Sequence, residues 1–329
     1  MRPTIDDLLA TARVVSLPLR TRFRGIDHRE ALLLEGPRGA TEFSPFVEYD
    51  DAEAATWLAA ALDFGWGDEP AVFRSSVRVN ATLPVVEPGR VAEVLDRFSG
   101  CRTVKVKVAD PGQRLEEEVA RVRAVREYLG PEGRIRLDAN GGWTVDEAER
   151  AVHALAEFDL EYVEQPCESV DELAQVRERI RYMGIGVAAD ESVRKAEDPL
   201  AVARAGAADL LVIKAQPLGG IAAAERIIAE AGLPVVVSSA LDTSVGLSMG
   251  AHLAAAVPQL EYDCGLGTAA LLTADVTDAP LTPIDGAVPV RRIDLSAGLL
   301  DRHEASADRR DWWLDRLRRC YALLDALDE

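Results

Sequence analysis

From residue 77 onwards, short apolar or alternating stretches recur at a regular interval, and longer stretches with helical periodicity separate nearly all of them. Strands that alternate with helices are joined by right-handed crossovers into a parallel sheet. Eight such strands fit a closed β/α barrel, although an open doubly wound sheet has the same alternation. No Gly-rich phosphate loop follows the first strand, which favours the barrel. The strand candidates begin near residues 77, 103, 134, 160, 186, 209, 234 and 260, and the helix candidates cover residues 115–129, 145–158, 170–182, 220–231 and 244–256.

The two ends of the chain have different patterns. Three strand candidates and an alanine-rich helix precede the barrel, which predicts a small α+β cap; they cover residues 13–19, 30–35, 40–46 and 52–63. Residues 309–327 form an amphipathic helix that we expect to pack back on this cap. The predicted capping domain therefore covers residues 1–76, the barrel residues 77–290 and the C-terminal tail residues 291–329.

Composition excludes several classes of function. A formal net charge of -19 argues against nucleic-acid binding, which needs a basic surface, and 48% hydrophobic residues support a large buried core. The four cysteines are far apart without a CxxC spacing, so they predict neither a zinc site nor a disulfide framework. No apolar stretch is long enough to cross a membrane, and no signal peptide is visible. We expect a cytoplasmic protein without membrane insertion; its oligomeric state is open, and a monomer is plausible.

A basic cluster lies between the first two strand candidates of the cap. It consists of Arg20, Arg22, Arg24, His28 and Arg29. Such a cluster is either a solvated hairpin loop or a mobile loop that attracts an anionic substrate to a site beneath it. The second interpretation depends on whether the barrel carries an active site.

Charged residues end five successive strand candidates of the barrel. They are Lys107, Asp138, Glu164, Asp190 and Lys214. Because side chains alternate between the two faces of a strand, all five can point inward at one level if the strands hold register. Barrel enzymes have their active sites at this end of the strands, where the loops form a mouth. The pattern therefore predicts an active site built from these five side chains.

Three carboxylates aimed at one mouth repel each other unless a cation joins them. Oxygen-only ligands suit Mg²⁺, for which Mn²⁺ can substitute, rather than Zn²⁺. We therefore predict a metal site at Asp138, Glu164 and Asp190; the alternative is that one or two of them only cap the helices that follow. A histidine-ligated site is a poor fit, because none of the four histidines stands at a strand end.

The lysines beside such a site indicate proton transfer. Lys105 and Lys107 share one face of their strand, while Val104 and Val106 face the other way. An edge strand with two solvated lysines is the alternative interpretation. A neighbouring ammonium lowers a lysine pKa, so Lys105 can help Lys107 to act as a base. Proton removal next to a carboxylate leaves an enediolate, whose charge a divalent cation and Lys214 can stabilise.

In order along the chain, these residues resemble the signature of the enolase superfamily, in its muconate-lactonising subgroup. The motifs are Lys105-x-Lys107, Asp138-Ala139-Asn140, Glu164-Gln165-Pro166, Asp190-Glu191-Ser192 and Lys214. Sites of this superfamily with a Lys or His base and Mg²⁺ are a known pattern. The resemblance implies a modified (β/α)7β barrel of the TIM type, with an α+β capping domain built from both chain ends.

Within this subgroup, three further motifs resemble the actinobacterial type of the o-succinylbenzoate synthase family. They are residues 214–220 (KAQPLGG), 238–246 (SSALDTSVG) and 264–268 (CGLGT). That resemblance implies a lyase of menaquinone biosynthesis that acts on a small carboxylate anion and dehydrates 2-succinyl-6-hydroxy-2,4-cyclohexadiene-1-carboxylate. It also implies that Lys107 is the base and then the acid, and that Lys214 stabilises the enediolate. We expect Ser239 and Gly265 to contact the substrate, with Asn140 close to the site.

Other reactions on the same fold remain open at this stage. N-acylamino-acid racemases and dipeptide epimerases of the subgroup use the same two lysines as bases on opposite faces. Dipeptide epimerases add an Asp-x-Asp motif at the eighth strand, to which Glu261-Tyr262-Asp263 is a partial match. A muconate cycloisomerase is a third possibility. A metal-binding barrel without catalysis belongs to a different class, against which the two intact lysines argue.

Overall fold

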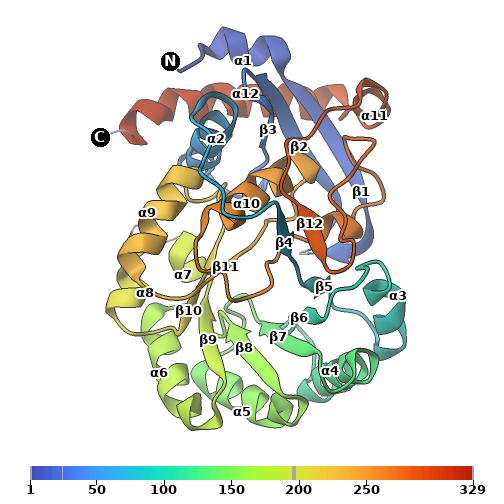
Figure 1. The fold of residues 1–329 in the computed structure, drawn as a ribbon, viewed down its shortest axis with the longest axis vertical. Coiled ribbons are helices and arrows are strands. Elements are labelled where there is room, and N and C mark those ends of the chain that lie inside the picture. Colours follow the sequence, from blue (N-terminus) through green and yellow to red (C-terminus); the bar gives the residue numbers. More distant parts are fainter. Residues whose placement is uncertain (1, 24, 195–197, 328–329) are drawn as a thin grey trace.

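The computed structural model describes residues 2–23, 25–194 and 198–327 and divides into a cap and a barrel (Figure 1). The cap is an antiparallel sheet covered by helices from both chain ends, and the two termini lie on it. Its elements are α1 (Ile5–Thr11), β1 (Arg13–Phe23), β2 (Ile26–Gly36), β3 (Gly39–Phe43), α2 (Asp51–Trp66), α11 (Ala297–Arg302) and α12 (Ala307–Leu323). β1, β2 and α2 extend the predicted ranges, β3 ends three residues before the predicted end, and α1 was not predicted.

The C-terminal helix is held to the cap by apolar packing. Trp313 is fully buried in α12 and packs edge-on against Phe43 of β3, with ring centroids 5.8 Å apart. Its indole nitrogen donates a hydrogen bond to Glu30, which also pairs with Arg309. Aromatic residues supply much of the burial energy of a small core. The cap therefore needs both ends of the chain to complete its core.

The barrel is a parallel sheet in which each strand pairs with its neighbours in the sequence. Residues that face outward, such as Val104, Val106 and Leu137, are buried against the surrounding helices. A parallel sheet needs cover on this face, which explains the valine-rich strands. The fold is the predicted modified β/α barrel with an α+β cap. Its strands are β5 (Ala81–Leu83), β6 (Thr103–Lys107), β7 (Arg134–Asp138), β8 (Leu160–Glu164), β9 (Gly186–Ala189), β10 (Leu210–Ile213) and β11 (Val235–Val237).

The two ends of the barrel sheet differ from the prediction. The strand expected from residue 77 is divided: β4 (Ser76–Arg78) pairs with β12 (Ala287–Pro289), and only β5 joins the barrel. The strand expected from residue 260 is wrong, because single bridges at Cys264 and Gly265 close the ring instead. Side-chain hydrogen bonds hold this segment instead of the backbone hydrogen bonds of a strand, since Asp263 accepts hydrogen bonds from Arg78 and Thr103.

Helices form the outer wall of the barrel (Figure 1). Capping boxes at Thr144 and Ser169 begin two of them, as the sequence motifs require. The helix α10 is buried on all sides, because it contacts both the cap strand β3 and the barrel. No helix of the described residues is long and apolar enough to cross a membrane. The helices are α3 (Val91–Leu95), α4 (Leu115–Leu129), α5 (Val145–Leu155), α6 (Val170–Ile180), α7 (Glu191–Arg194), α8 (Ala201–Arg204), α9 (Ile221–Ala231) and α10 (Ser244–Ala256).

Candidate active site

The predicted lysines and carboxylates meet at the carboxyl ends of the barrel strands. The register pairs Lys107 of β6 with Asp138 of β7, and Asp138 with Glu164 of β8. Asp190 and Lys214 follow directly after β9 and β10. Since all these strands are parallel, their last inward-facing residues lie at the same level. The structure thus brings together the five strand-end residues that alternation predicted.

Ion pairs connect the first lysines to two of the carboxylates. The Lys105 ammonium lies 2.8 Å from Glu164 Oε1 and 3.0 Å from Asp138 Oδ2. The Lys107 ammonium donates to the same Asp138 Oδ2 at 2.6 Å and to Asn140 Oδ1 at 2.7 Å. Both ammonium groups therefore share one carboxylate oxygen, which places two positive charges beside each other as the sequence motif suggested.

A second set of contacts lies at the other side of the mouth. Lys214 Nζ donates to Asp190 Oδ2 at 2.5 Å, and Arg194 Nε lies 3.1 Å from Asp190 Oδ1. Arg194 also pairs with Glu191 and is buried. Sequence analysis did not select Arg194, because it belongs to the short helix after β9 and not to a strand end. Its position three residues after Glu191 was the only local signal.

Burial and neighbouring charges shift the titration of these groups. Burial raises the pKa of Glu164 to about 7, and the nearby Asp138 carboxylate adds to that rise. Burial also opposes ionisation of Asp138, but the Lys105 and Lys107 ammonium groups hold its pKa well below the usual range. The pKa of Lys107 is lowered by burial and by the Lys105 ammonium, although the Asp138 carboxylate acts to raise it. Lys107 is therefore the lysine of the pair that loses its proton more easily, because the carboxylates raise the pKa of Lys105 despite burial.

The carboxylates have the donor chemistry of a site for a hard divalent cation. Asp138, Glu164 and Asp190 are at most 1% exposed, and Glu164 Oε2 is a buried oxygen without a hydrogen-bond partner. Within the described ranges there is no preformed group of three or more His, Cys, Asp or Glu side chains that could hold a metal ion. The lysines pair with the carboxylates instead. A bound divalent cation would offset the charge repulsion between Glu164 and Asp138, so the oxygen-only donor set fits Mg²⁺ or Mn²⁺.

A small cavity of about 30 Å³ lies above these residues and shares lining residues with a larger one. Lys105, Lys107 and Lys214 line the small cavity together with the predicted substrate contacts Asn140, Ser239 and Gly265. Ser239 Oγ donates a hydrogen bond to the Gly265 carbonyl at 2.8 Å, so these two residues form one wall.

The adjoining cavity has a volume of about 570 Å³ and extends towards the hairpin of the cap. Phe23, Lys107 and Asn140 line both cavities. Phe23 comes from the end of β1 and lies with its ring centroid 5.5 Å from the Lys107 ammonium. Sequence analysis did not select Phe23, because it stands between two arginines of the hairpin.

The basic cluster of the cap does not form one solvated group. Arg29 is 2% exposed and donates from Nε to the Leu241 carbonyl at 3.0 Å. Arg20 and Arg22 donate to the Leu272 and Gly25 carbonyls. Arg24 lies outside the described residues. Arg29 is therefore a buried residue of this cluster, and its hydrogen bond to Leu241 joins the cap to the barrel.

Arg29 holds two walls of the small cavity. Its guanidinium lies 4.5 Å from the ring centroid of Phe46, and both Phe46 and Leu241 line that cavity. Leu241 has a φ of 63°, a left-handed conformation that is strained for a leucine. The hydrogen bond from Arg29 helps to hold it there. No sequence pattern marks such a contact, because it joins residues far apart in the chain.

Two family models match this chain. "Enolase C-terminal domain-like" covers residues 90–298, and "Enolase N-terminal domain-like" covers residues 14–65. Among solved structures, the muconate lactonizing enzyme from Pseudomonas putida has the same fold with a TM-score of 0.74 at 20% identity, covering 89% of this chain and 98% of that one. A dipeptide epimerase from Enterococcus faecalis, complexed with Mg and a dipeptide, has a TM-score of 0.71 at 23% identity, covering 86% and 96%.

Curated relatives are much more similar in sequence. The o-succinylbenzoate synthase of Thermobifida fusca is 56% identical over 289 residues, which are 87% of this chain and 89% of that protein. The o-succinylbenzoate synthase of Mycobacterium ulcerans is 52% identical over 322 residues, which are 98% of this chain and 96% of that protein. The chain therefore belongs to the o-succinylbenzoate synthase family of the enolase superfamily.

Proposed function

We propose that this protein is an o-succinylbenzoate synthase, a lyase that converts 2-succinyl-6-hydroxy-2,4-cyclohexadiene-1-carboxylate into 2-succinylbenzoate and water. The observation that carries the proposal is a cavity with a lysine on each side, each hydrogen-bonded to a different buried carboxylate. Relatives at 52% and 56% identity with this name support the choice of reaction.

In this mechanism Lys107 transfers protons on one face of the substrate. Its neutral amine takes the proton from the ring carbon that bears the carboxylate, which leaves an enediolate. The resulting ammonium then donates that proton to the departing hydroxyl on the neighbouring ring carbon, so water leaves and the ring becomes aromatic. The lowered pKa of Lys107 favours the first of these steps, since it increases the fraction of neutral amine.

Lys214 has an electrostatic role on the opposite side. Its ion pair with Asp190 holds the side chain at the cavity, where a positive charge stabilises the enediolate as it forms. Asp138, Glu164 and Asp190 would hold a Mg²⁺ ion, or Mn²⁺ in its place, which supplies a Lewis acid for the substrate carboxylate when bound. Asn140 orients Lys107 through its hydrogen bond, and the wall formed by Ser239 and Gly265 contacts the substrate.

The substrate is a small carboxylate anion, for which the cavity has suitable chemistry. Lysines and Arg194 provide positive charge, while Phe23, Phe46 and Leu241 provide an apolar wall for the ring. The small cavity alone has room for little more than a water molecule. Phe23 lines both cavities, so the Phe23 side chain must move to make room for the substrate ring.

One observation argues against dipeptide epimerisation. The partial motif at Glu261-Tyr262-Asp263 lies at the other end of the barrel, where Asp263 accepts hydrogen bonds from Arg78 and from Thr103 at the start of β6. Asp263 is therefore not available to bind a substrate amine beside Lys107. N-acylamino-acid racemisation needs no such motif and is the second reaction to test.

The test is a direct assay of both reactions. With Mg²⁺, we expect the wild-type protein to form 2-succinylbenzoate, followed by its ultraviolet absorbance, and Lys107→Ala to lower kcat by at least about 1,000-fold, since acid and base steps both use this amine. Circular dichroism checks that the variant is folded. Exchange of the α-proton of N-succinylamino acids in D₂O measures racemase activity. Full dehydration activity in Lys107→Ala, or racemisation without dehydration by wild type, would contradict the proposal.

A further inference from the structure

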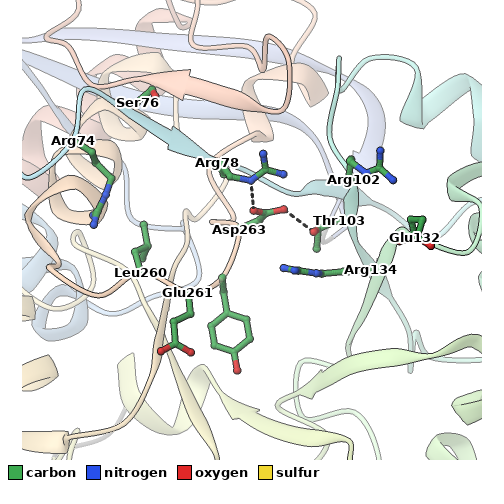
Figure 2. Close-up of a pocket in the computed structure, with 11 residues that line it drawn as sticks. Arg74, Ser76, Arg78, Arg102, Thr103, Glu132, Arg134, Leu260, Glu261 and Asp263 are labelled. Atoms are coloured by element: carbon green, nitrogen blue, oxygen red, sulfur yellow. Dashed lines mark hydrogen bonds and ion pairs between the residues drawn. The ribbon is translucent and has the colours of Figure 1, made fainter.

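A second cavity, of about 490 Å³, opens at the opposite end of the barrel from the active site (Figure 2). It lies at the starts of β6 and β7, the same strands that end in Lys107 and Asp138. Four arginines line it: Arg74, Arg78, Arg102 and Arg134. In β/α barrels this end of the strands normally serves stability. The contacts of each arginine show which of its donors the fold uses.

Arg74 and Asp263 form hydrogen bonds with other residues of the fold. The two terminal nitrogens of Arg74 donate to the carbonyls of Ala254, Val257 and Pro258. Asp263 is 6% exposed and accepts from Arg78 Nε at 3.0 Å and from Thr103 Oγ1 at 2.7 Å. Of the three guanidinium nitrogens of Arg78, only Nε donates a hydrogen bond to a described residue. Its two terminal nitrogens have no hydrogen-bond partner in the described part of the chain.

Arg102 directly precedes β6, and Arg134 is the first residue of β7. The backbone N–H of Arg134 donates to the Arg102 carbonyl at 2.9 Å, which joins the starts of two neighbouring strands. Arg102 has no ion pair or side-chain hydrogen bond with any described residue. Among the described residues, the Arg134 guanidinium approaches only the Glu161 carboxylate, at 3.5 Å, and that carboxylate lies closer to Arg136, at 2.5 Å.

The other carboxylates at the cavity do not neutralise these arginines. Glu132 and Glu261 line it, but neither forms an ion pair within the described residues. Figure 2 shows Arg78, Arg102 and Arg134 grouped around Thr103 and Asp263, with Glu261 on the far side near Leu260. The Arg78 and Arg134 side chains are 63% and 56% exposed, so three accessible guanidinium groups with donors that no described residue uses lie at one cavity of a chain with a net charge of -19.

We propose that this cavity binds a small organic dianion, a phosphate monoester or a dicarboxylate, between Arg78, Arg102 and Arg134. A guanidinium presents its donors as a planar fork that matches carboxylate and phosphate groups with two hydrogen bonds. Leu260 and Tyr262 provide an apolar side for the organic part of the ligand. This inference does not depend on the reaction proposed above.

Calorimetry with two probes tests the site and distinguishes the two sources of negative charge. Phenyl phosphate and phthalate are titrated separately into metal-free wild-type protein at constant ionic strength. Saturable binding of either probe is expected, and the one that binds more tightly identifies the phosphate or the carboxylate form of the ligand. Absence of saturable binding for both probes would overturn the proposal.

Variants locate the binding. Arg102→Gln combined with Arg134→Gln should weaken binding by at least about tenfold, because charge-assisted hydrogen bonds are lost. The matched control combines Arg114→Gln and Arg181→Gln, two exposed arginines away from the cavity, and should bind like wild type. Unchanged affinity in the first double variant would refute the site.

A third variant separates this cavity from the active site, which also attracts anions. Lys107→Ala should bind the probe with wild-type affinity, since Lys107 lies at the opposite end of β6. Loss of probe binding in Lys107→Ala would place the dianion in the active site and overturn the proposal. Thermal unfolding of each variant without probe checks that the fold is intact.

Discussion

A buried pair of acids between the cap and the barrel should make the stability of this protein fall as the pH rises. Glu42 of β3 is fully buried and accepts hydrogen bonds from Ser44, Thr243 and Gly246. Asp242, 4% exposed, follows in the loop before α10, and its Oδ1 has no hydrogen-bond partner. Two such carboxylates favour a shared proton, because burial and repulsion both oppose a second charge.

Burial raises the pKa of Glu42 and also that of Asp242. The pKa of Asp242 rises to about 7, and Glu42 adds to the rise, while Arg29 and Lys214 oppose it. In the unfolded chain the pKa of an aspartate is about 3.9. A raised folded-state pKa means that the stabilising contribution is complete below the unfolded pKa and is lost as the pH rises through the folded pKa.

The perturbation is Asp242→Asn, which keeps the shape of the protonated acid and removes its titration. From the two pKa values, wild type should lose about 2 kcal/mol more unfolding free energy than this variant between about pH 5.5 and about pH 8.5. Urea unfolding followed by circular dichroism at a series of pH values measures the difference. The pH dependence of groups that do not interact with Asp242 is common to both proteins and cancels.

Asp68→Asn, at an exposed position, serves as the control and should follow the wild-type pH dependence. Parallel stability curves for wild type and Asp242→Asn across this pH range would refute the reasoning. They would mean that Asp242 is ionised in the folded protein at every pH tested, with a partner that offsets its burial.

Three other perturbations test the cap, the cavity wall and the metal site. Trp313→Ala should lower the unfolding free energy by about 3–5 kcal/mol through loss of a fully buried aromatic side chain, measured by urea unfolding; a loss below about 1 kcal/mol would contradict the packing argument. Arg29→Met should raise KM by about tenfold with a smaller change in kcat, because the Leu241 wall relaxes, whereas the exposed control Arg38→Met should leave both unchanged. Glu164→Gln should weaken Mg²⁺ binding by at least about tenfold in calorimetry, and wild-type affinity would exclude Glu164 as a ligand.

The strand-end residues were predictable because alternation along a strand is a local property. Lys107, Asp138 and Glu164 each end a short apolar strand, and parallel pairing in register then brings them to one level. The structure shows this convergence, while their catalytic and metal-binding roles remain predictions. The eighth strand was not predictable in the same way. Side-chain hydrogen bonds of Asp263 hold that segment, and the pattern of apolar residues does not record them.

The sequence by itself determined the alternation of strands and helices, the order of the lysines and carboxylates, and the family of the chain. These features follow from side-chain periodicity and from motifs within short segments. Only the tertiary structure decided that Arg29 of the cap holds Leu241 of the barrel, and that Arg102 and Arg134 share a cavity away from the active site. Such contacts join residues far apart in the chain, so their energies depend on burial and on neighbouring charges that exist only after folding.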